Sequence, residues 1–234
     1  MADFTERTVR LIGEQNVRRL KGSTVAVFGL GGVGSYALEA VARAGVGRII
    51  IADFDTVDIT NINRQLLTLH SNIGMEKTAL AAERIREINP GCTVFPHQTR
   101  ICTDTLPLFD GYAIDAAIDC IDSVEDKIEL LVYLNRRKII TVSSMGAALK
   151  TDPSRIEVMP IHETRVCPLA KRIRRALRER NVSEGGIYAV SSTEAPIPLR
   201  ERPLGSISYL PALFGLHCAA ETLLHLAPLS DYPA

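Results

Sequence analysis

Paired cysteines are missing from this sequence of 234 residues. The five cysteines stand singly along the chain, at Cys92, Cys102, Cys120, Cys167 and Cys218. Without a C-x-x-C pair the chain cannot form a structural zinc site of the usual kind, with four cysteine ligands, and single cysteines do not make the disulfide framework of a short secreted protein. The pattern predicts a protein of the reducing cytoplasm.

Net charge and long apolar runs are missing as well. The 27 Lys and Arg balance 27 Asp and Glu, so no overall field attracts nucleic acid and a polyanion must bind a local patch. Residues 1–15 carry charges where a signal peptide has its apolar core. The apolar stretch 206–229 is too broken to span a membrane, because it contains Pro211, His217, Glu221 and His225. We therefore expect no membrane association.

Length and periodicity indicate the fold class. A chain of 234 residues suffices for one sizeable α/β domain. Short β-branched runs alternate with amphipathic stretches, which predicts a Rossmann-like, doubly wound, mainly parallel sheet behind an N-terminal helical arm. The expected strands are 24–29, 48–55, 92–98, 113–122 and 139–146, and the expected helices are 6–21, 35–47, 76–91 and 125–138.

The regular alternation weakens near residue 150. Beyond it the sequence predicts a strand at 155–161, a very basic helix at 167–180 and a last apolar helix within 206–229. The stretch 181–205 is longer than an ordinary loop and is interpreted as a lid, a binding loop or disorder. We expect a single domain over 1–234, made of an arm (1–22), a core (23–150) and an elaborated C-terminal region (151–234).

Glycines follow the first predicted strand. The spacing G-x-G-x-x-G, directly after a strand and before a helix, is formed by Gly29, Gly31, Gly32 and Gly34. Such glycines let the backbone turn tightly and approach a phosphate at the helix N-terminus, and Asp53 lies where an acid binds ribose hydroxyls. The core is therefore predicted to bind a nucleotide. A tight turn without ligand is the alternative, and the fingerprint alone would favour NAD.

A polar run with an arginine follows Asp53. The segment DFDTVDITNINRQ includes Asp55, Asn61 and Arg64, and Lys77 begins the next predicted helix. Hydride transfer needs no pair of cations near the adenosine end. Attack on a nucleotide phosphate does need them, because preplaced Arg and Lys stabilise charge on the phosphoryl oxygens. We therefore predict a triphosphate clamp and ATP as the nucleotide.

Carboxylates end the fourth predicted strand. Asp119 and Asp122 would lie beside the crevice, where a carboxylate holds the Mg²⁺ that accompanies nucleotide phosphates. Asp122 is the preferred ligand. Either aspartate could instead cap the following helix, a role for which Ser123 competes.

These motifs together resemble the ubiquitin-activating-enzyme-like superfamily of ATP-using adenylating enzymes, over roughly residues 7–150. The resemblance implies catalytic roles for Arg64, Lys77, Asp122 and Arg7, the last entering the site of a second copy from the N-terminal arm, with Arg10 as second choice. It thus implies a homodimer. The residues implied in binding ATP and Mg²⁺ are Gly29, Gly31, Gly32, Gly34, Asp53, Asp55, Asn61, Arg64, Lys77, Asp122 and Ser123.

One branch of the superfamily matches nearly the whole chain. The segments RLIGEQNVRRL, TNINRQ, IDSVEDK, CPLAKRIRRALRER and SSTE resemble the tRNA threonylcarbamoyladenosine dehydratase family. Membership implies ATP-dependent activation of the threonylcarbamoyl carboxylate on tRNA, followed by cyclisation with loss of water. It also raises a sulfur-transfer protein as a partner. The chain departs from the family pattern at Ala147–Lys150, where GAALKTDP replaces GxGNKxDP.

A local basic patch supports an RNA substrate independently. Six basic residues and one acid lie between positions 171 and 180, beside an apolar stripe of Leu169, Ile173 and Leu177. The spacing i, i+3, i+4, i+7 places four of them on one helix face, where they fit a phosphate backbone: Lys171, Arg174, Arg175 and Arg178. A solvated helix face is the alternative.

Other features are interpreted as structural. Cys167 heads the basic helix and could be a nucleophile, but a lone cysteine before a proline is more often inert. His217, Glu221 and His225 recur on one helix face and fit the polar side of an amphipathic helix better than a metal site. Two functions remain as alternatives to the tRNA dehydratase: an adenylating enzyme for a sulfur-carrier protein, and an NAD-dependent oxidoreductase or nucleotide-sensing module.

Overall fold

Among the residues that the structure describes, seven strands form one sheet in the order β3-β2-β1-β4-β5-β7-β6. The structure is a computed structural model and describes residues 4–182, 185–198 and 204–229. All neighbouring strands run parallel except β6, which pairs antiparallel with β7, so the predicted doubly wound, mainly parallel fold is confirmed. The strands are β1 (Thr24–Phe28), β2 (Arg48–Asp53), β3 (Thr93–Gln98), β4 (Ala116–Asp119), β5 (Ile140–Ser144), β6 (Ile156–Pro160) and β7 (Ile187–Ser192).

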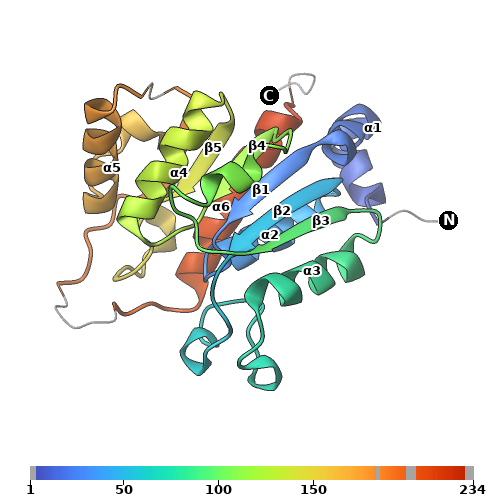
Figure 1. Cartoon of the computed structure of the whole chain (residues 1–234), viewed down its shortest axis with the longest axis horizontal. Helices are drawn as coiled ribbons and strands as arrows, with labels where there is room; N and C mark the ends of the chain where they lie inside the picture. The colour runs from blue at the N-terminus through green and yellow to red at the C-terminus, as the bar shows by residue number, and fades with distance from the viewer. Residues whose placement is uncertain (1–3, 183–184, 199–203, 230–234) are drawn as a thin grey trace.

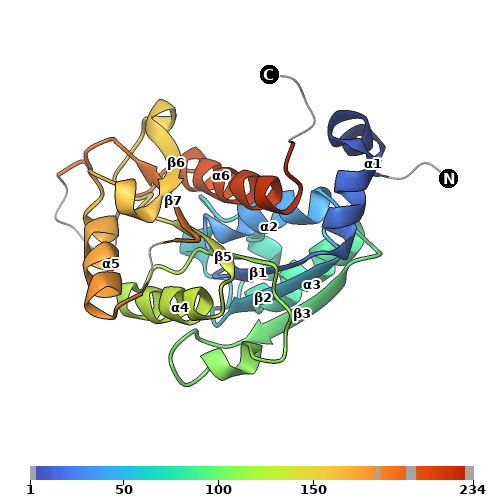
Figure 2. The ribbon, with the colours of Figure 1, turned by 90° about the horizontal axis from the view of Figure 1, so that it is seen from above.

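Helices cover both faces of the sheet (Figures 1 and 2). The side chains of Val25 and Val27 face one layer, built from α2, α3 and α6. Their neighbours Ala26 and Phe28 face the opposite layer, which contains α4, and α5 packs beside α4 against β7. The helices are α1 (Glu6–Gly22), α2 (Gly34–Arg43), α3 (Lys77–Ile88), α4 (Val124–Arg136), α5 (Pro168–Glu179) and α6 (Tyr209–Leu226).

The sequence explains why the central elements form where they do. All five residues of β1 are buried, as expected for a continuous apolar run covered on both faces. The chain leaves α2 through Gly45, whose φ of 88° is costly for any residue with a side chain. Pro168 opens α5 at a position where a helix does not need its N–H.

The prediction for residues 181–205 was wrong in part. Strand β7 lies within this stretch, pairs with β5 and β6, and completes the sheet. Its polar end, Ser191 and Ser192, is buried by the neighbouring strands, which a local pattern cannot reveal. Residues 183–184 and 199–203 of the stretch lie outside the described residues.

The last helix joins the C-terminal region to the core. As predicted, the apolar C-terminal segment is helical, and α6 packs along α2. A Cβ at Gly215 would lie 2.2 Å from the carbonyl oxygen of Val33, so only glycine allows the two helices to approach this closely. No helix within the described ranges is both long and apolar enough to cross a bilayer.

Candidate functional site

The loops after β1 and β4 meet at the carboxyl edge of the sheet. These strands are neighbours, and their chains continue into helices on opposite faces. Ligands bind at such a switch point in α/β proteins. The loops are in contact, because a Cβ on Gly29 would lie 2.9 Å from the carbonyl oxygen of Cys120.

The glycine turn links β1 to α2. Gly29 has a φ of 87°, and a Cβ on Gly34 would lie only 1.8 Å from the carbonyl oxygen of Gly29. These two glycines are required for the turn itself. Gly31 differs, because the nearest atom to a Cβ there is Gln65 Nε2 at 3.9 Å. The backbone at Gly31 is therefore open to a ligand, at the positive end of α2.

Asp53 ends β2 directly beside the turn. Its carboxylate is 8% exposed and accepts hydrogen bonds from the main-chain N–H groups of Leu30 at 2.5 Å and Asp55 at 2.8 Å. Burial raises the pKa of Asp53, and these two N–H donors partly oppose the rise. A carboxylate retains further acceptor positions, so Asp53 can both fix the turn and bind ribose hydroxyls.

Lys77 and Asp55 form an ion pair next to Asp53. Lys77 is the first residue of α3 and is 2% exposed, and its Nζ lies 2.8 Å from Asp55 Oδ2. The structure therefore brings together two residues that the sequence assigned separately to the ATP site. Asp55 holds the ammonium in a fixed place.

Asn61 and Arg64 lie in the loop between β2 and α3. Asn61 ends the short helix η1 (Ile59–Asn61), and its Oδ1 accepts from the N–H of Asp58. The Arg64 guanidinium donates to the carbonyl oxygen of Thr60 at 2.8 Å and to Asn63 Oδ1 at 2.9 Å. The stem of Arg64 contacts the glycine turn, 3.2 Å from a Cβ on Gly32. The stem of Arg64 thus lies against the glycine turn, while its guanidinium is folded onto its own loop.

Gln65 supports a polar ligand at the turn. Its side chain is 7% exposed, and Oε1 has no hydrogen-bond partner among the described residues. A buried amide oxygen without a partner is costly. The amide nitrogen of the same side chain, Nε2, is the nearest atom to a Cβ on Gly31, so Gln65 can donate to a polar group that approaches the open backbone there.

Asp122 and Ser123 take different roles after β4. Ser123 is the N-cap of α4, and its hydroxyl oxygen accepts from the N–H of Asp126. The Asp122 side chain is exposed. Within the described residues, no three His, Cys, Asp or Glu side chains are grouped as a metal site would require. The exposed Asp122 carboxylate has acceptor oxygens available to a ligand, and Mg²⁺ binding by Asp122 stays a prediction.

The buried pair of Asp119 and Lys127 was missed by the sequence reasoning. Lys127 Nζ lies 2.6 Å from Asp119 Oδ2, and both side chains are fully buried. Ser143 donates to the same oxygen at 2.6 Å, and the N–H of Ile121 donates to Asp119 Oδ1 at 3.1 Å. Asp119 is thus committed to shaping the loop that carries Asp122. A lysine on the buried face of the predicted helix 125–138 was the available signal.

Arg7 lies far from this site within one chain. Thr5, just before α1, contacts Gly45 beyond the end of α2. The glycine turn is at the other end of α2, roughly 15 Å away at ~1.5 Å per helical residue. Figure 1 shows α1 remote from the loop between β2 and α3. Within one chain, Arg7 is therefore not part of this site, and its predicted role stays a prediction.

The basic helix forms as predicted, but its cations are not equivalent. Lys171, Arg175 and Arg178 are exposed, whereas Arg174 is half-buried and donates to the carbonyl and hydroxyl oxygens of Thr164. Carboxylates also reduce the charge of the face, through the pairs Arg172–Glu125, Arg175–Glu179 and Arg180–Glu129. Its buried stripe is Ala170, Ile173 and Leu177, with Leu169 only half-buried.

The features interpreted as structural have packing partners. Cys167 is 3% exposed at the start of α5. His225 Nε2 lies 3.1 Å from Glu221 Oε1, and the His225 ring packs on Tyr188 with centroids 4.4 Å apart. Glu221 and His225 thus lie side by side on α6, as their spacing predicts.

Comparison with known proteins identifies the family. The ThiF family model matches residues 5–230. The tRNA threonylcarbamoyladenosine dehydratase of Bacillus subtilis is 45% identical over 190 residues, which cover 81% of this chain and 74% of the relative. The Escherichia coli enzyme of that name is 38% identical over 194 residues, covering 80% and 72%.

Solved structures agree with the sequence relatives. The E. coli dehydratase TcdA in complex with AMP has a TM-score of 0.88 and 35% identity, covering 94% of this chain and 92% of that chain. The same enzyme in complex with ATP has a TM-score of 0.87. E. coli MccB with ATP, at 18% identity, shares the fold. The chain belongs to the ThiF family and, within it, to the tRNA threonylcarbamoyladenosine dehydratases.

Proposed function

We propose that this protein is an ATP-dependent tRNA threonylcarbamoyladenosine dehydratase, active as one adenylating domain over residues 1–234. The observation that carries the proposal is 45% identity to the B. subtilis dehydratase over 74% of that protein. The open backbone at Gly31, the nearby Asp53 and the Lys77–Asp55 pair provide a site suited to ATP.

Different side chains bind the ribose, the phosphates and the metal of the nucleotide. Asp53 binds the ribose, and the N–H groups at Gly31 and the start of α2 bind phosphate. Arg64 and Lys77 stabilise the charge that develops on the phosphoryl oxygens. Asp122 would hold Mg²⁺, which supplies further charge neutralisation when bound.

The reaction consumes one ATP and removes one water from the substrate. An oxygen of the threonylcarbamoyl carboxylate bonds to a phosphorus of ATP, and the bond to the departing phosphate group breaks. The ureido group then bonds to the activated carbonyl carbon and releases a nitrogen-bound proton to solvent, and the phosphorylated oxygen leaves with its electron pair. The carboxylate oxygen thus departs on phosphorus, and the substrate becomes a ring.

Partners follow from the same proposal. The exposed cations Lys171, Arg175 and Arg178 contact the tRNA backbone, and Arg174 supports them from beneath. A second copy of the chain supplies Arg7, which makes the enzyme a homodimer. A sulfur-transfer protein remains a predicted partner, and the cytoplasm the predicted location.

ATP consumption distinguishes the proposal from its main alternative. AMP or ADP should accumulate only when threonylcarbamoylated tRNA is added. Consumption that depends on a small protein ending in Gly-Gly, and not on tRNA, would favour an enzyme that activates a sulfur carrier. Nicotinamide binding without ATP binding would instead indicate the oxidoreductase.

A further inference from the structure

The loop after β5 lies beside Asp122, on the side away from the glycine turn. In the sheet register Asp119 of β4 pairs with Ser143 of β5. Asp122 and Gly146 each follow three residues later, so they leave the same edge of the sheet on adjacent strands. A group approaching the nucleotide from the β5 side must pass this loop.

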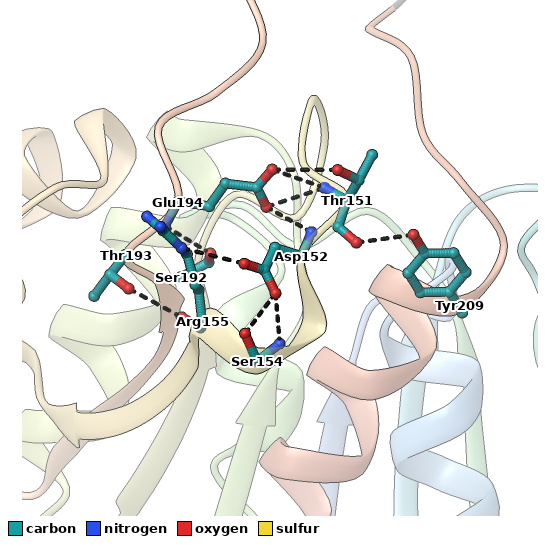
Figure 3. Close-up of polar contacts among 8 residues, drawn as sticks. All are labelled: Thr151, Asp152, Ser154, Arg155, Ser192, Thr193, Glu194 and Tyr209. Carbon is teal, nitrogen blue, oxygen red and sulfur yellow. Dashed lines mark hydrogen bonds and ion pairs between the residues drawn. The ribbon is translucent and has the colours of Figure 1, made fainter.

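Glu194 holds the end of this loop. Its carboxylate follows β7 and accepts main-chain N–H groups from Thr151, at 3.0 and 3.1 Å, and from Asp152, at 2.9 Å (Figure 3). The Glu194 N–H in turn donates to Ser192 Oγ at 3.0 Å. These N–H donors, that of Asp152 first, lower the pKa of Glu194, and burial only partly opposes them. One carboxylate therefore joins two segments more than forty residues apart.

Other bonds brace the same loop from both sides. Tyr209, at the start of α6, donates its hydroxyl to the carbonyl oxygen of Thr151 at 2.8 Å. Leu149 donates its N–H to Gly205 at 3.0 Å and accepts from Ile197 at 2.8 Å. Leu149 has a φ of 60°, a conformation that a leucine keeps only where its surroundings impose it.

Within the loop, a buried cation closes the turn. Lys150 is 5% exposed, and its Nζ donates to the carbonyl oxygen of Gly146 at 3.0 Å. A buried ammonium is costly unless a negative charge lies nearby. The charge of Glu194 acts on Lys150, and the braced loop packs around it. The loop is therefore fixed internally as well as at its ends.

The braced loop connects with the nucleotide site through the segment before α6 and the first turn of α6. Asn63 Nδ2 donates to the carbonyl oxygen of Ser206 at 3.3 Å. Pro211 Cβ lies 3.1 Å from a Cβ on Gly32 in the glycine turn. Residues 146–152 and 204–209 thus form a continuous wall, which starts beside Asp122 and ends at the phosphate-binding loops.

We propose that this wall receives the carboxylate-bearing group of the tRNA and that Glu194 is the positioning residue that holds it in place. The inference rests on the proposed dehydratase function. Glu194 acts through the main chain of Thr151 and Asp152 and does not touch the nucleotide. Its removal lets the wall shift, and misplacement by about 1 Å can reduce a rate by on the order of 10².

Steady-state kinetics of Glu194→Ala test the proposal. At saturating ATP and threonylcarbamoylated tRNA we expect kcat to fall by about 10- to 100-fold. ATP affinity and the KM for tRNA should stay within about twofold, because the nucleotide contacts and the phosphate contacts of tRNA remain. Glu194→Gln should recover part of the loss, since one carbonyl oxygen can still accept both N–H groups. Glu157→Ala, an exposed glutamate on β6, is the matched control.

A double-mutant cycle adds a second readout. Tyr209→Phe removes the brace on the other side of Thr151, so its effect on kcat should be strongly non-additive with that of Glu194→Ala. Additive losses, equal loss of ATP binding, or a Glu194→Ala enzyme with normal kcat would overturn the proposal. If Glu194→Ala does not fold, Glu194→Gln and Tyr209→Phe carry the same test. An inactive wild-type protein would instead refute the dehydratase function itself.

Discussion

Gly31 and Gly34 lie in the same turn, but a methyl group would meet different surroundings at each. Gly34→Ala would place a Cβ 1.8 Å from a main-chain oxygen, whereas Gly31→Ala would meet nothing closer than 3.9 Å. We expect Gly34→Ala to unfold the turn and lower stability by about 3 kcal/mol or more. Gly31→Ala should keep the stability of the wild type and lose ATP affinity, because the methyl group occupies the approach of the phosphate.

Urea unfolding and calorimetric ATP titration of both variants check this pair. Normal ATP affinity in Gly31→Ala would show that the phosphate does not bind there.

At single positions, the sequence predicted residues whose roles depend on chain spacing. Asp53 was placed by its distance from the glycines, and the structure puts it in contact with the turn. Lys127 and Glu194 could not be found in this way. Their partners, Asp119 and the main chain of Thr151, lie on other elements. These contacts depend on how the elements pack in three dimensions, which the sequence alone does not give.

At the scale of elements, the exposed cations of α5 lead to a prediction about tRNA binding. Lys171 and Arg175 are exposed, so replacing both with glutamine should raise the KM for tRNA and reduce the salt dependence of binding, by about one unit of slope for each phosphate that the variant no longer neutralises. ATP binding should not change. Arg174→Gln is the matched control, because its bonds to Thr164 lie within the protein. This substitution should lower the melting temperature more than it weakens tRNA binding.

Filter binding over a range of salt concentrations measures the effect on tRNA, and thermal unfolding measures the effect on stability. If the double variant keeps the wild-type salt slope, the basic face of α5 does not contact tRNA and is an ordinary solvated helix surface.

The contact between α2 and α3 leads to a prediction about how stability depends on pH. Glu39 on α2 accepts from Arg84 on α3 at 2.6 and 3.0 Å and from Arg43 at 2.8 Å. Burial by itself would raise the pKa of Glu39, but the bonds from Arg84 and Arg43 outweigh it and lower the pKa. A lowered folded pKa contributes stability above the unfolded value, and this contribution is lost as pH falls through the folded pKa.

Glu39→Gln should therefore be less stable than the wild type by about 0.5–1 kcal/mol at neutral pH, since the pair is partly exposed. The difference should shrink when pH falls below the usual range of a glutamate. Denaturant unfolding of both proteins at neutral and at acid pH tests this prediction. If the stability difference persists in acid, it arises from packing and not from the ion pair.

Elements with a strong local signal were predicted well, and those set by distant partners were not. The alternation of apolar runs and amphipathic stretches gave β1 to β5 and the helices between them. In contrast, β7 follows a stretch without helical or strand periodicity and ends in two buried serines. It is a strand because β5 and β6 supply hydrogen-bond partners on both sides, which no local pattern in 181–205 encodes.

At the scale of the whole molecule, the distance of Arg7 from its own site predicts complementation between chains. Arg7→Ala and Arg64→Ala should each retain little activity alone. In a mixed dimer one site combines Arg7 from one chain with Arg64 from the other. Random exchange of subunits makes about half of the dimers mixed, and each mixed dimer has one complete site out of two. About a quarter of wild-type activity should therefore return.

Co-refolding the two variants and measuring turnover tests this prediction. A mixture that stays inactive while forming dimers would mean that Arg7 does not act in the partner's site.

The nucleoside product is the most direct test of the central claim, that this chain is an ATP-dependent tRNA dehydratase. Threonylcarbamoylated tRNA is incubated with the protein, ATP and Mg²⁺, and the digested nucleosides are analysed by mass spectrometry. We predict conversion to a nucleoside lighter by one water, slowed by on the order of 10²–10³ in Arg64→Ala and restored only in part by Arg64→Lys. An unchanged nucleoside, under conditions in which the E. coli dehydratase converts the same tRNA, would contradict the claim.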